Sequence, residues 1–243
     1  MKFKFLKKNL FTYSIVFLFL GLFSLIAFTS YAKAKSSGNN SKEIPTIILD
    51  PGHGGEDGGA VGVDGIVEKD INLAISLKLQ NFLEASGYKV IMTREKDTAI
   101  YDDNLKTLRE KKRSDLRNRM GIINKSKEEE KTVFVSIHQN KFPDSKYFGT
   151  QIFYSVNDSK SENLANKIKD SVTGLLQPEN EREIKPATNK IFLLHNAHIP
   201  AVIAECGFIS NPEESAKLKT EKYQNQMAFS IYCGIVNYFM EDT

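Results

Sequence analysis

Two histidines and two glutamates stand where they could share one chemical task. His53 closely follows the apolar run Thr46 to Leu49, His138 ends the run FVSIH, and Glu205 ends the run AVIAE. Glu68 opens a helical pattern that begins after a glycine-rich stretch. Two imidazoles and one carboxylate, with one position open for water, are the ligands of several catalytic zinc sites. The glutamate that is left over would then be free to take a proton from that water.

Each of these residues also has an ordinary structural explanation. A histidine at a strand end is often only hydrogen-bonded, and Glu68 could simply stabilise a helix N-terminus with its negative charge. Glu205 is harder to explain in this way, because a carboxylate after four apolar residues is costly to bury without a partner. His195 and His198 are further possible ligands, but their segment HNAHIP has the composition of an exposed turn. We expect neither of them to bind metal.

The glycine-rich stretch must bring His53 to the other ligands. It belongs to the sequence PTIILDPGHGGEDGGA, from Pro45 to Ala60, which also holds two carboxylates, Glu56 and Asp57. Pro51 has no N–H for a sheet and should end the strand before it. Glycines carry no Cβ, so the chain can turn sharply there and its backbone can approach a metal or ligand closely.

The elements expected around these residues alternate between strands and helices. The expected strands are Thr46–Leu49, Tyr88–Arg94, Lys131–His138, Gly149–Val156, Ile191–His195 and Ala201–Glu205. The expected helices are Glu68–Ala85, Leu105–Asn124, Ser161–Leu176, a segment through Ala216, and Tyr223–Phe239. This alternation predicts an α/β fold with a mixed, largely parallel central sheet and helices on both faces. In such folds the active site lies beyond the carboxyl ends of the strands, where three of the four candidate residues fall.

The first 43 residues have a different composition. Four lysines precede an uncharged, apolar run from Asn9 to Ala32, which approaches the ~20 residues needed to cross a bilayer. We expect a membrane anchor in residues 1–32, although the small residues of SYAKA also suit a cleaved signal. Residues 33–43 are rich in Ser, Gly and Asn and are predicted to be a linker, followed by a catalytic domain over residues 44–243. With either an anchor or a signal, that domain should be exported.

Charge and cysteine content narrow the possible partners. The formal net charge is only +3, and no dense basic stretch with interleaved aromatic residues follows the linker, so nucleic acid is not expected as a partner. Cys206 and Cys233 could pair in an exported protein. We expect instead that both are small core residues, because they lie in an apolar run and on the apolar face of a terminal helix.

Together these blocks resemble a known enzyme family. The sequences ILDPGHGGEDGGA, LRNRMGIIN, FVSIHQN and IPAVIAECGFISNPEE occur in the order found in the zinc-dependent N-acetylmuramoyl-L-alanine amidases of the type-3 family. The likeness extends from about Ile47 to Phe239. It implies that His53, Glu68 and His138 hold Zn²⁺, that Glu205 is the catalytic carboxylate, and that the fold is of the zinc-exopeptidase kind.

The chain departs from the family at one place near the site. The usual block Ser-Ile-His-Ala-Asn has Gln139 in place of the alanine, while Asn140 is kept. The resemblance implies that Asn140 binds substrate. Arg94 and Arg119 are further candidates, since a guanidinium can hold a carboxylate through two hydrogen bonds, but a salt bridge with a residue such as Asp115 is an equal alternative.

The resemblance also implies a function and partners. The enzyme would hydrolyse the amide between N-acetylmuramic acid and the L-alanine of the peptidoglycan stem peptide. A short chain of anchor, linker and bare catalytic domain is most similar to the spore-cortex amidases that prepare muramic-δ-lactam, which would place it at the outer face of a membrane or in the spore intermembrane space. Some relatives need activators, so an accessory protein is a possible partner. The alternatives are a zinc peptidase acting on free peptides and a non-catalytic wall-binding module.

Overall fold

The computed structural model describes residues 44–126 and 131–241. Residues 44–243 form one compact unit, which begins where the sequence predicts the catalytic domain. The predicted anchor and linker lie outside the described residues, so both remain predictions. A search of the described ranges finds no helix that is long and apolar enough to cross a membrane.

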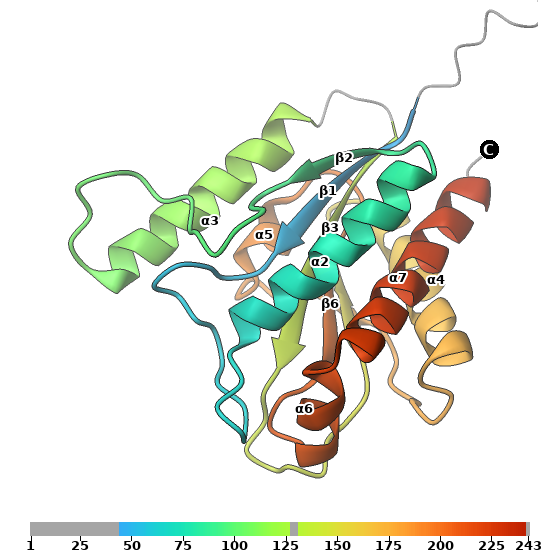
Figure 1. Cartoon of the computed structure of the whole chain (residues 1–243). Coiled ribbons are helices and arrows are strands. Elements are labelled where there is room, and N and C mark those ends of the chain that lie inside the picture. Colours follow the sequence, from blue (N-terminus) through green and yellow to red (C-terminus); the bar gives the residue numbers. More distant parts are fainter. Residues whose placement is uncertain (1–43, 127–130, 242–243) are drawn as a thin grey trace, which may run out of the picture. The chain divides into compact units, whose positions relative to one another are not determined.

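A six-stranded sheet forms the centre of the unit (Figure 1). Its strands are β1 (Thr46–Pro51), β2 (Lys89–Met92), β3 (Thr132–Asn140), β4 (Gln151–Tyr154), β5 (Lys185–Pro186) and β6 (Ala201–Phe208), in the order β2-β1-β3-β6-β4-β5. Strands β2, β1, β3 and β6 are parallel, whereas β4 runs antiparallel to β6. The mixed, largely parallel sheet expected from the sequence is therefore present.

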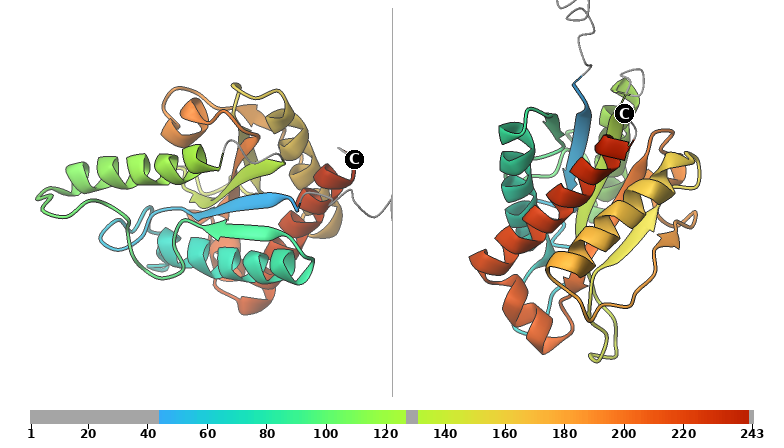
Figure 2. Two further views of the ribbon diagram at one scale, coloured as in Figure 1. Left: turned by 90° about the horizontal axis from the view of Figure 1, so that it is seen from above. Right: turned by 90° about the vertical axis from the view of Figure 1, so that its right-hand side faces the viewer.

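Helices cover both faces of this sheet (Figure 2). The helices are α2 (Glu68–Ala85), α3 (Leu108–Lys125), α4 (Lys160–Leu175), α5 (Phe192–Asn196), α6 (Pro212–Leu218) and α7 (Glu221–Glu241). Helices α2, α4 and α7 pack on one face and α3 and α5 on the other.

Successive apolar side chains of the central strands point alternately into two hydrophobic cores, one on each face of the sheet. On β1, Ile47 and Leu49 belong to the larger core beneath α2, α4 and α7, while Ile48 between them belongs to the smaller core beneath α3 and α5. On β3, Val133 and Val135 face the larger core and Phe134 faces the smaller one. Because the strand period is two, a strand with helices on both faces reads as an unbroken apolar run.

One expected strand is wrong. Residues Ile191 to His195 are not a strand, because Phe192–Asn196 form the short helix α5. The amide of Ala197 donates to the carbonyl of Leu193 across this turn, and Leu193 and Leu194 are both buried in the smaller core. Two adjacent buried leucines suit one helical turn better than a strand with a single buried face, but periodicity alone cannot distinguish such a short run.

Only one of the two cysteines is the core residue that the sequence suggested, because Cys233 on α7 is partly exposed and belongs to neither core. Cys206 and Cys233 are free, and Cys206 is fully buried in the larger core. No disulfide therefore stabilises the unit.

Candidate metal centre and active site

The loop after β1 delivers His53 to the carboxyl end of the sheet. The amide of Gly52 donates to the carbonyl of Ile137 on β3 (3.0 Å), which extends the pairing of the two strands by one bond. His53 then adopts a positive φ of 63°, an uncommon conformation for a residue with a side chain. A Cβ on Gly52 would lie 2.2 Å from Nε2 of His138. Only glycine therefore fits where the loop passes the second histidine.

His53, Glu68 and His138 converge on one point. Each offers a ligand atom, and these atoms all lie within 4.8 Å of one another. Oε1 of Glu68 is 3.3 Å from Nε2 of His53 and 2.8 Å from Nδ1 of His138. Two imidazole nitrogens and a carboxylate oxygen are a donor set that zinc accepts. Gly59 leaves room for the carboxylate, because a Cβ at this position would lie 2.5 Å from Oε2 of Glu68. The residues present therefore fit the metal that the sequence pattern indicates.

A carboxylate and a lysine stand behind His53. Oδ2 of Asp57 accepts from Nδ1 of His53 (2.9 Å), and Nζ of Lys112 on α3 contacts Oδ1 of Asp57 (2.7 Å). Burial lowers the pKa of His53, but its hydrogen bonds to Asp57 and Glu68 outweigh this effect and raise the pKa to about 9. The Asp57 bond fixes the imidazole so that Nε2 faces Glu68, as carboxylate partners of metal-binding histidines do.

The sequence did not assign this role to Asp57. Its place in the glycine-rich stretch, four residues after His53, was the only signal. In an irregular loop, a separation of four residues does not by itself predict that two side chains are in contact.

Polar groups of β3 and α2 also form hydrogen bonds with the carboxylate of Glu68. The backbone amide of Gln139 donates to Oε1 of Glu68 (3.1 Å), and the side-chain amide of Asn72 lies 3.4 Å from the same oxygen. Nε2 of Gln139 in turn donates to Oδ1 of Asn72 (3.2 Å). Burial raises the pKa of Glu68, but hydrogen bonds from His138 and His53 outweigh it and hold the pKa well below its usual range. Gln139 is therefore part of the hydrogen-bonded support of the Glu68 carboxylate.

Glu205 lies across the ladder from His138. The two residues are paired in register between β3 and β6. Oε2 of Glu205 is buried and has no hydrogen-bond partner among the described residues. Burial raises the pKa of Glu205 to about 7, although the nearby His138 acts in the opposite direction. A half-buried carboxylate with an unused oxygen beside three candidate ligand side chains is suited to proton transfer near neutral pH.

Arg119 and Arg94 both form hydrogen bonds to the backbone of the loop after β1. Arg119 is 2% exposed, and its guanidinium donates to the carboxylates of Asp50 and Asp115 and to the carbonyls of Pro51 and His53. This geometry favours the alternative of a buried ion pair over a contact with substrate.

Arg94 is placed in the same way. It is also buried and donates to the carbonyls of Pro51, Gly52, Lys69 and Lys96. Its bonds run to the backbone of the loop and of the start of α2, so a role in fixing the loop explains its position.

The other candidates from the sequence are Asn140, His195 and His198. Asn140 ends β3, two residues after His138, and its carbonyl accepts from the amide of Ile209 (2.9 Å). His195 lies in α5 and not in the turn expected from the sequence, and His198 follows the helix. Both are exposed and take no part in the group formed by His53, Glu68 and His138.

A family model described as N-acetylmuramoyl-L-alanine amidase matches residues 47–237, which include all four residues of the site. The chain belongs to the N-acetylmuramoyl-L-alanine amidase family. The match spans every strand of the sheet except the first residue of β1, so the membership concerns the whole domain.

Individual amidases agree with this membership. A germination-specific N-acetylmuramoyl-L-alanine amidase from Bacillus subtilis is 40% identical over 195 residues, covering 80% of each chain. The solved structure of the CwlD amidase from Clostridioides difficile, in complex with the GerS lipoprotein, is 46% identical and covers 82% of this chain and 100% of its own, with a TM-score of 0.77. The catalytic domain of the amidase CwlV from Bacillus (Paenibacillus) polymyxa is 30% identical, with a TM-score of 0.65 and coverages of 81% and 99%. These amidases share the α/β fold.

Proposed function

We propose that the chain is a zinc-dependent peptidoglycan hydrolase that cleaves the amide between N-acetylmuramic acid and the L-alanine of the stem peptide. The observation that carries the proposal is the pairing of His138 with Glu205, which sets an unpartnered carboxylate oxygen beside the ligand atoms of His53, Glu68 and His138. Family membership makes the muramyl amide the bond to be cut.

The division of labour follows from the environment of each side chain. His53, Glu68 and His138 would hold Zn²⁺, a Lewis acid that polarises a carbonyl and lowers the pKa of water to about 7. Glu205 would take a proton from the attacking water, because its pKa of about 7 leaves a large fraction ionised at neutral pH. An amide nitrogen leaves poorly unless it is protonated, so Glu205 would then donate the same proton to the nitrogen of alanine.

Digestion of intact peptidoglycan tests the reaction. The proposal requires muramic acid residues with a free lactyl carboxylate and stem peptides with a free alanine amino group, both measured by mass spectrometry. A zinc peptidase acting on free peptides would leave every muramyl stem attached, and a non-catalytic wall-binding module would release nothing.

Glu205→Gln tests the role of the base. The variant should lose nearly all turnover, by at least ~10²-fold, while it still binds zinc, because glutamine keeps the shape but cannot take a proton. Normal turnover by this variant would refute the assignment of Glu205.

We further propose that the substrate is spore cortex, on the route to muramic-δ-lactam. The support is the similarity to a germination-specific amidase and to the CwlD amidase. The test is to express the chain in a spore-former that lacks its own cortex amidase and to measure muramic-δ-lactam in the cortex. Unchanged lactam content in spores that contain the active enzyme would refute the cortex assignment.

Export, anchoring and an accessory protein belong to the same proposal. An apolar segment in residues 1–32 would hold the domain at the outer face of a membrane. The CwlD amidase was solved in complex with a lipoprotein, and this supports an accessory partner for the present chain as well. Full zinc occupancy and full activity of the purified chain alone would show that no partner is needed.

A further inference from the structure

A loop beside the metal centre presents large apolar side chains to solvent. In the segment 141–150, between β3 and β4, Phe142 is 48% exposed and Phe148 is 45% exposed. Tyr147 lies between them in sequence, and its ring centroid is 4.8 Å from that of Phe142 in an edge-to-face arrangement. We call Phe142, Tyr147, Phe148 and the nearby Arg182 the aromatic ledge. Exposed aromatic groups gathered on one loop can mark a binding site.

The backbone beneath the aromatic ledge is fixed. The amide of Phe142 donates to Oγ of Ser210 (3.0 Å), and the amide of Gly149 donates to the carboxylate of Glu214 (3.0 Å). The side chain of Asn211 donates to the carbonyl of Ser145 (2.9 Å). The exposed rings are therefore presented by an anchored loop, and a ligand would bind them without ordering the loop first.

Arg182 joins the loop to the segment that follows α4. Its guanidinium carbon is 4.6 Å from the ring centroid of Phe208 and 5.6 Å from that of Tyr147. Its Nε donates to the carbonyl of Phe148 (2.7 Å). Within residues 44–126 and 131–241 it forms no ion pair. A groove of about 270 Å³ opens between residues 146–148 and 179–182.

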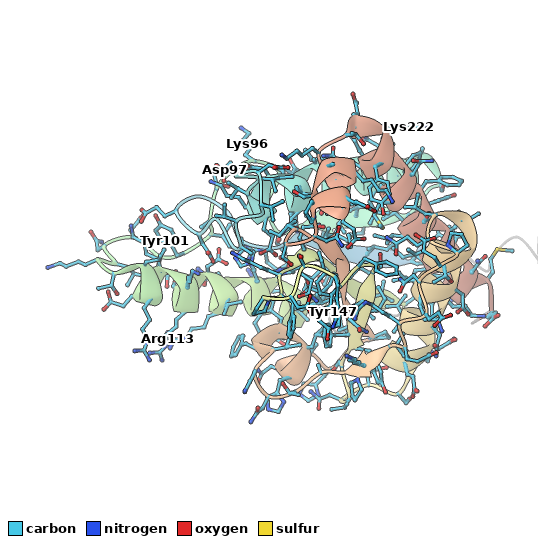
Figure 3. All side chains as sticks on the ribbon, turned by 90° about the horizontal axis from the view of Figure 1, so that it is seen from below. Lys96, Asp97, Tyr101, Arg113, Tyr147 and Lys222 are labelled. Carbon is cyan, nitrogen blue, oxygen red and sulfur yellow. The ribbon has the colours of Figure 1, made fainter. Side chains whose placement is uncertain are left out.

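The aromatic ledge starts where the catalytic strands end. Strand β3 carries His138 and ends at Asn140, two residues before Phe142, while β6 carries Glu205 and ends at Phe208. Gln151, three residues after Phe148, pairs with Glu205 in register. Adjacent strands lie ~5 Å apart and three residues span at most ~11 Å, so the backbone of Phe148 lies within about 15 Å of that of Glu205. Figure 3 views this end of the sheet, toward which the arrows of β1 and β3 point in Figure 1, and Tyr147 lies near the middle of the face.

The charges around the groove favour an uncharged ligand. Lys146 pairs with Asp144 (2.9 Å), and the exposed Glu179 and Glu181 line the groove beside Arg182. A ligand rich in carboxylates, such as a stem peptide, would meet these acidic groups. A hexosamine ring has an apolar face that can stack on phenylalanine and a polar edge that can accept from the N–H groups of arginine.

We propose that the aromatic ledge is a second substrate subsite, which binds a hexosamine ring of the glycan strand next to the muramyl residue whose amide is cut. This inference rests on the proposed function. In that function the scissile amide is attached to a glycan strand, and the neighbouring sugars of the strand must extend past the catalytic residues. Because of the aromatic ledge, the enzyme would prefer a muramyl amide on a glycan strand over a muramyl amide on a single sugar.

The direct test is binding of an uncharged N-acetylglucosamine tetrasaccharide to the full-length chain, measured by calorimetry. Wild type should bind, and Phe142→Ala/Phe148→Ala and Arg182→Gln should each weaken binding by about tenfold. Phe229→Ala is the matched control, since Phe229 is also 45% exposed but lies on α7, and it should bind as wild type does. Circular dichroism would confirm that each variant is folded, and Phe148→Tyr should retain binding because it keeps the ring.

A second measurement separates the subsite from the reaction. The ratio of kcat/KM on peptide-bearing glycan strands to kcat/KM on a single-sugar muramyl peptide should fall by about tenfold in the double variant. An unchanged ratio together with unchanged tetrasaccharide binding would overturn the subsite and point to a protein partner, while amide cleavage itself would leave the proposed function standing. Tetrasaccharide binding that depends on the aromatic ledge in a chain that cleaves no amide would overturn the proposed function alone.

Discussion

At the scale of single residues, the candidate site is a chain of contacts that runs from Lys112 to His138. Lys112 contacts Asp57, Asp57 holds His53, and Glu68 lies between His53 and His138. The two carboxylates raise the pKa of His53, so they favour a proton on its imidazole. A dication would take the place of that proton, so metal affinity and proton affinity are linked at this residue.

Zinc binding should therefore strengthen as pH rises. The pKa of His53 is raised to about 9, so its proton competes with the metal at pH values up to about 9 and is lost above it. Zinc titrations at a series of pH values should show affinity that increases up to about pH 9 and then levels off. Affinity that stays constant over this range would show that His53 is not a ligand.

Asp57→Asn should weaken zinc binding without removing a ligand. The asparagine can no longer hold the imidazole of His53 as a carboxylate does, and loss of such a partner typically lowers metal affinity by 10- to 100-fold. Asp64→Asn is the control, since among the described residues Asp64 forms an ion pair with the surface residue Lys219 alone. Competition with a zinc-binding dye measures both variants, and equal affinities would exclude a role for Asp57 in the metal site.

At the scale of elements, the loop after β1 is held at a close approach to β3. Gly52→Ala would place a Cβ 2.2 Å from Nε2 of His138, so either the loop or the imidazole must move. We expect a large loss of zinc affinity. Gly121→Ala in α3 meets nothing within 4 Å and should stabilise the protein by roughly 0.5–1 kcal/mol, because alanine favours a helix over glycine. Normal zinc binding by Gly52→Ala would show that the loop is not held as tightly as the structure indicates.

The ion pair of Arg119 and Asp50 links α3 to the end of β1. Burial raises the pKa of Asp50, but Arg119 and the hydroxyls of Ser136 and Thr93 outweigh it and lower the pKa. Arg119→Met should reduce the free energy of unfolding by roughly 3–5 kcal/mol, since it leaves a buried carboxylate without its cation. Arg113→Met, on an exposed position of the same helix (Figure 3), should change it by less than about 0.5 kcal/mol in urea titrations. Equal stabilities of the two variants would mean that the buried pair contributes little.

These contacts separate what the sequence could predict from what it could not. Strand periodicity and the ends of the parallel strands placed His53, His138 and Glu205 at one edge of the sheet, as the structure confirms. The contacts of Asp57, Lys112 and Arg119 depend on the path of an irregular loop, which no periodic pattern describes. The helix α5 was missed because the apolar run Ile191 to Leu194 is short enough to fit either a strand or one helical turn.

At the scale of the whole molecule, the site exists only when distant segments meet. Glu68 and His138 are 70 residues apart in the chain, and Glu205 reaches them through the pairing of β3 with β6. Parallel pairing makes this convergence possible, because it gathers the carboxyl ends of β1, β3 and β6 on one side. The aromatic ledge lies at the same edge of the sheet. One face of the domain would therefore bind both the reacting amide and the glycan strand to which the amide is attached.

Anomalous scattering at the zinc edge from a crystal of the zinc-loaded domain tests the central claim most directly. We predict one strong peak that lies about 2.0–2.2 Å from a nitrogen of His53, a nitrogen of His138 and an oxygen of Glu68, with Glu205 beside it but not bound. A peak held by other residues, or no peak in a loaded crystal, would contradict the assignment of these side chains.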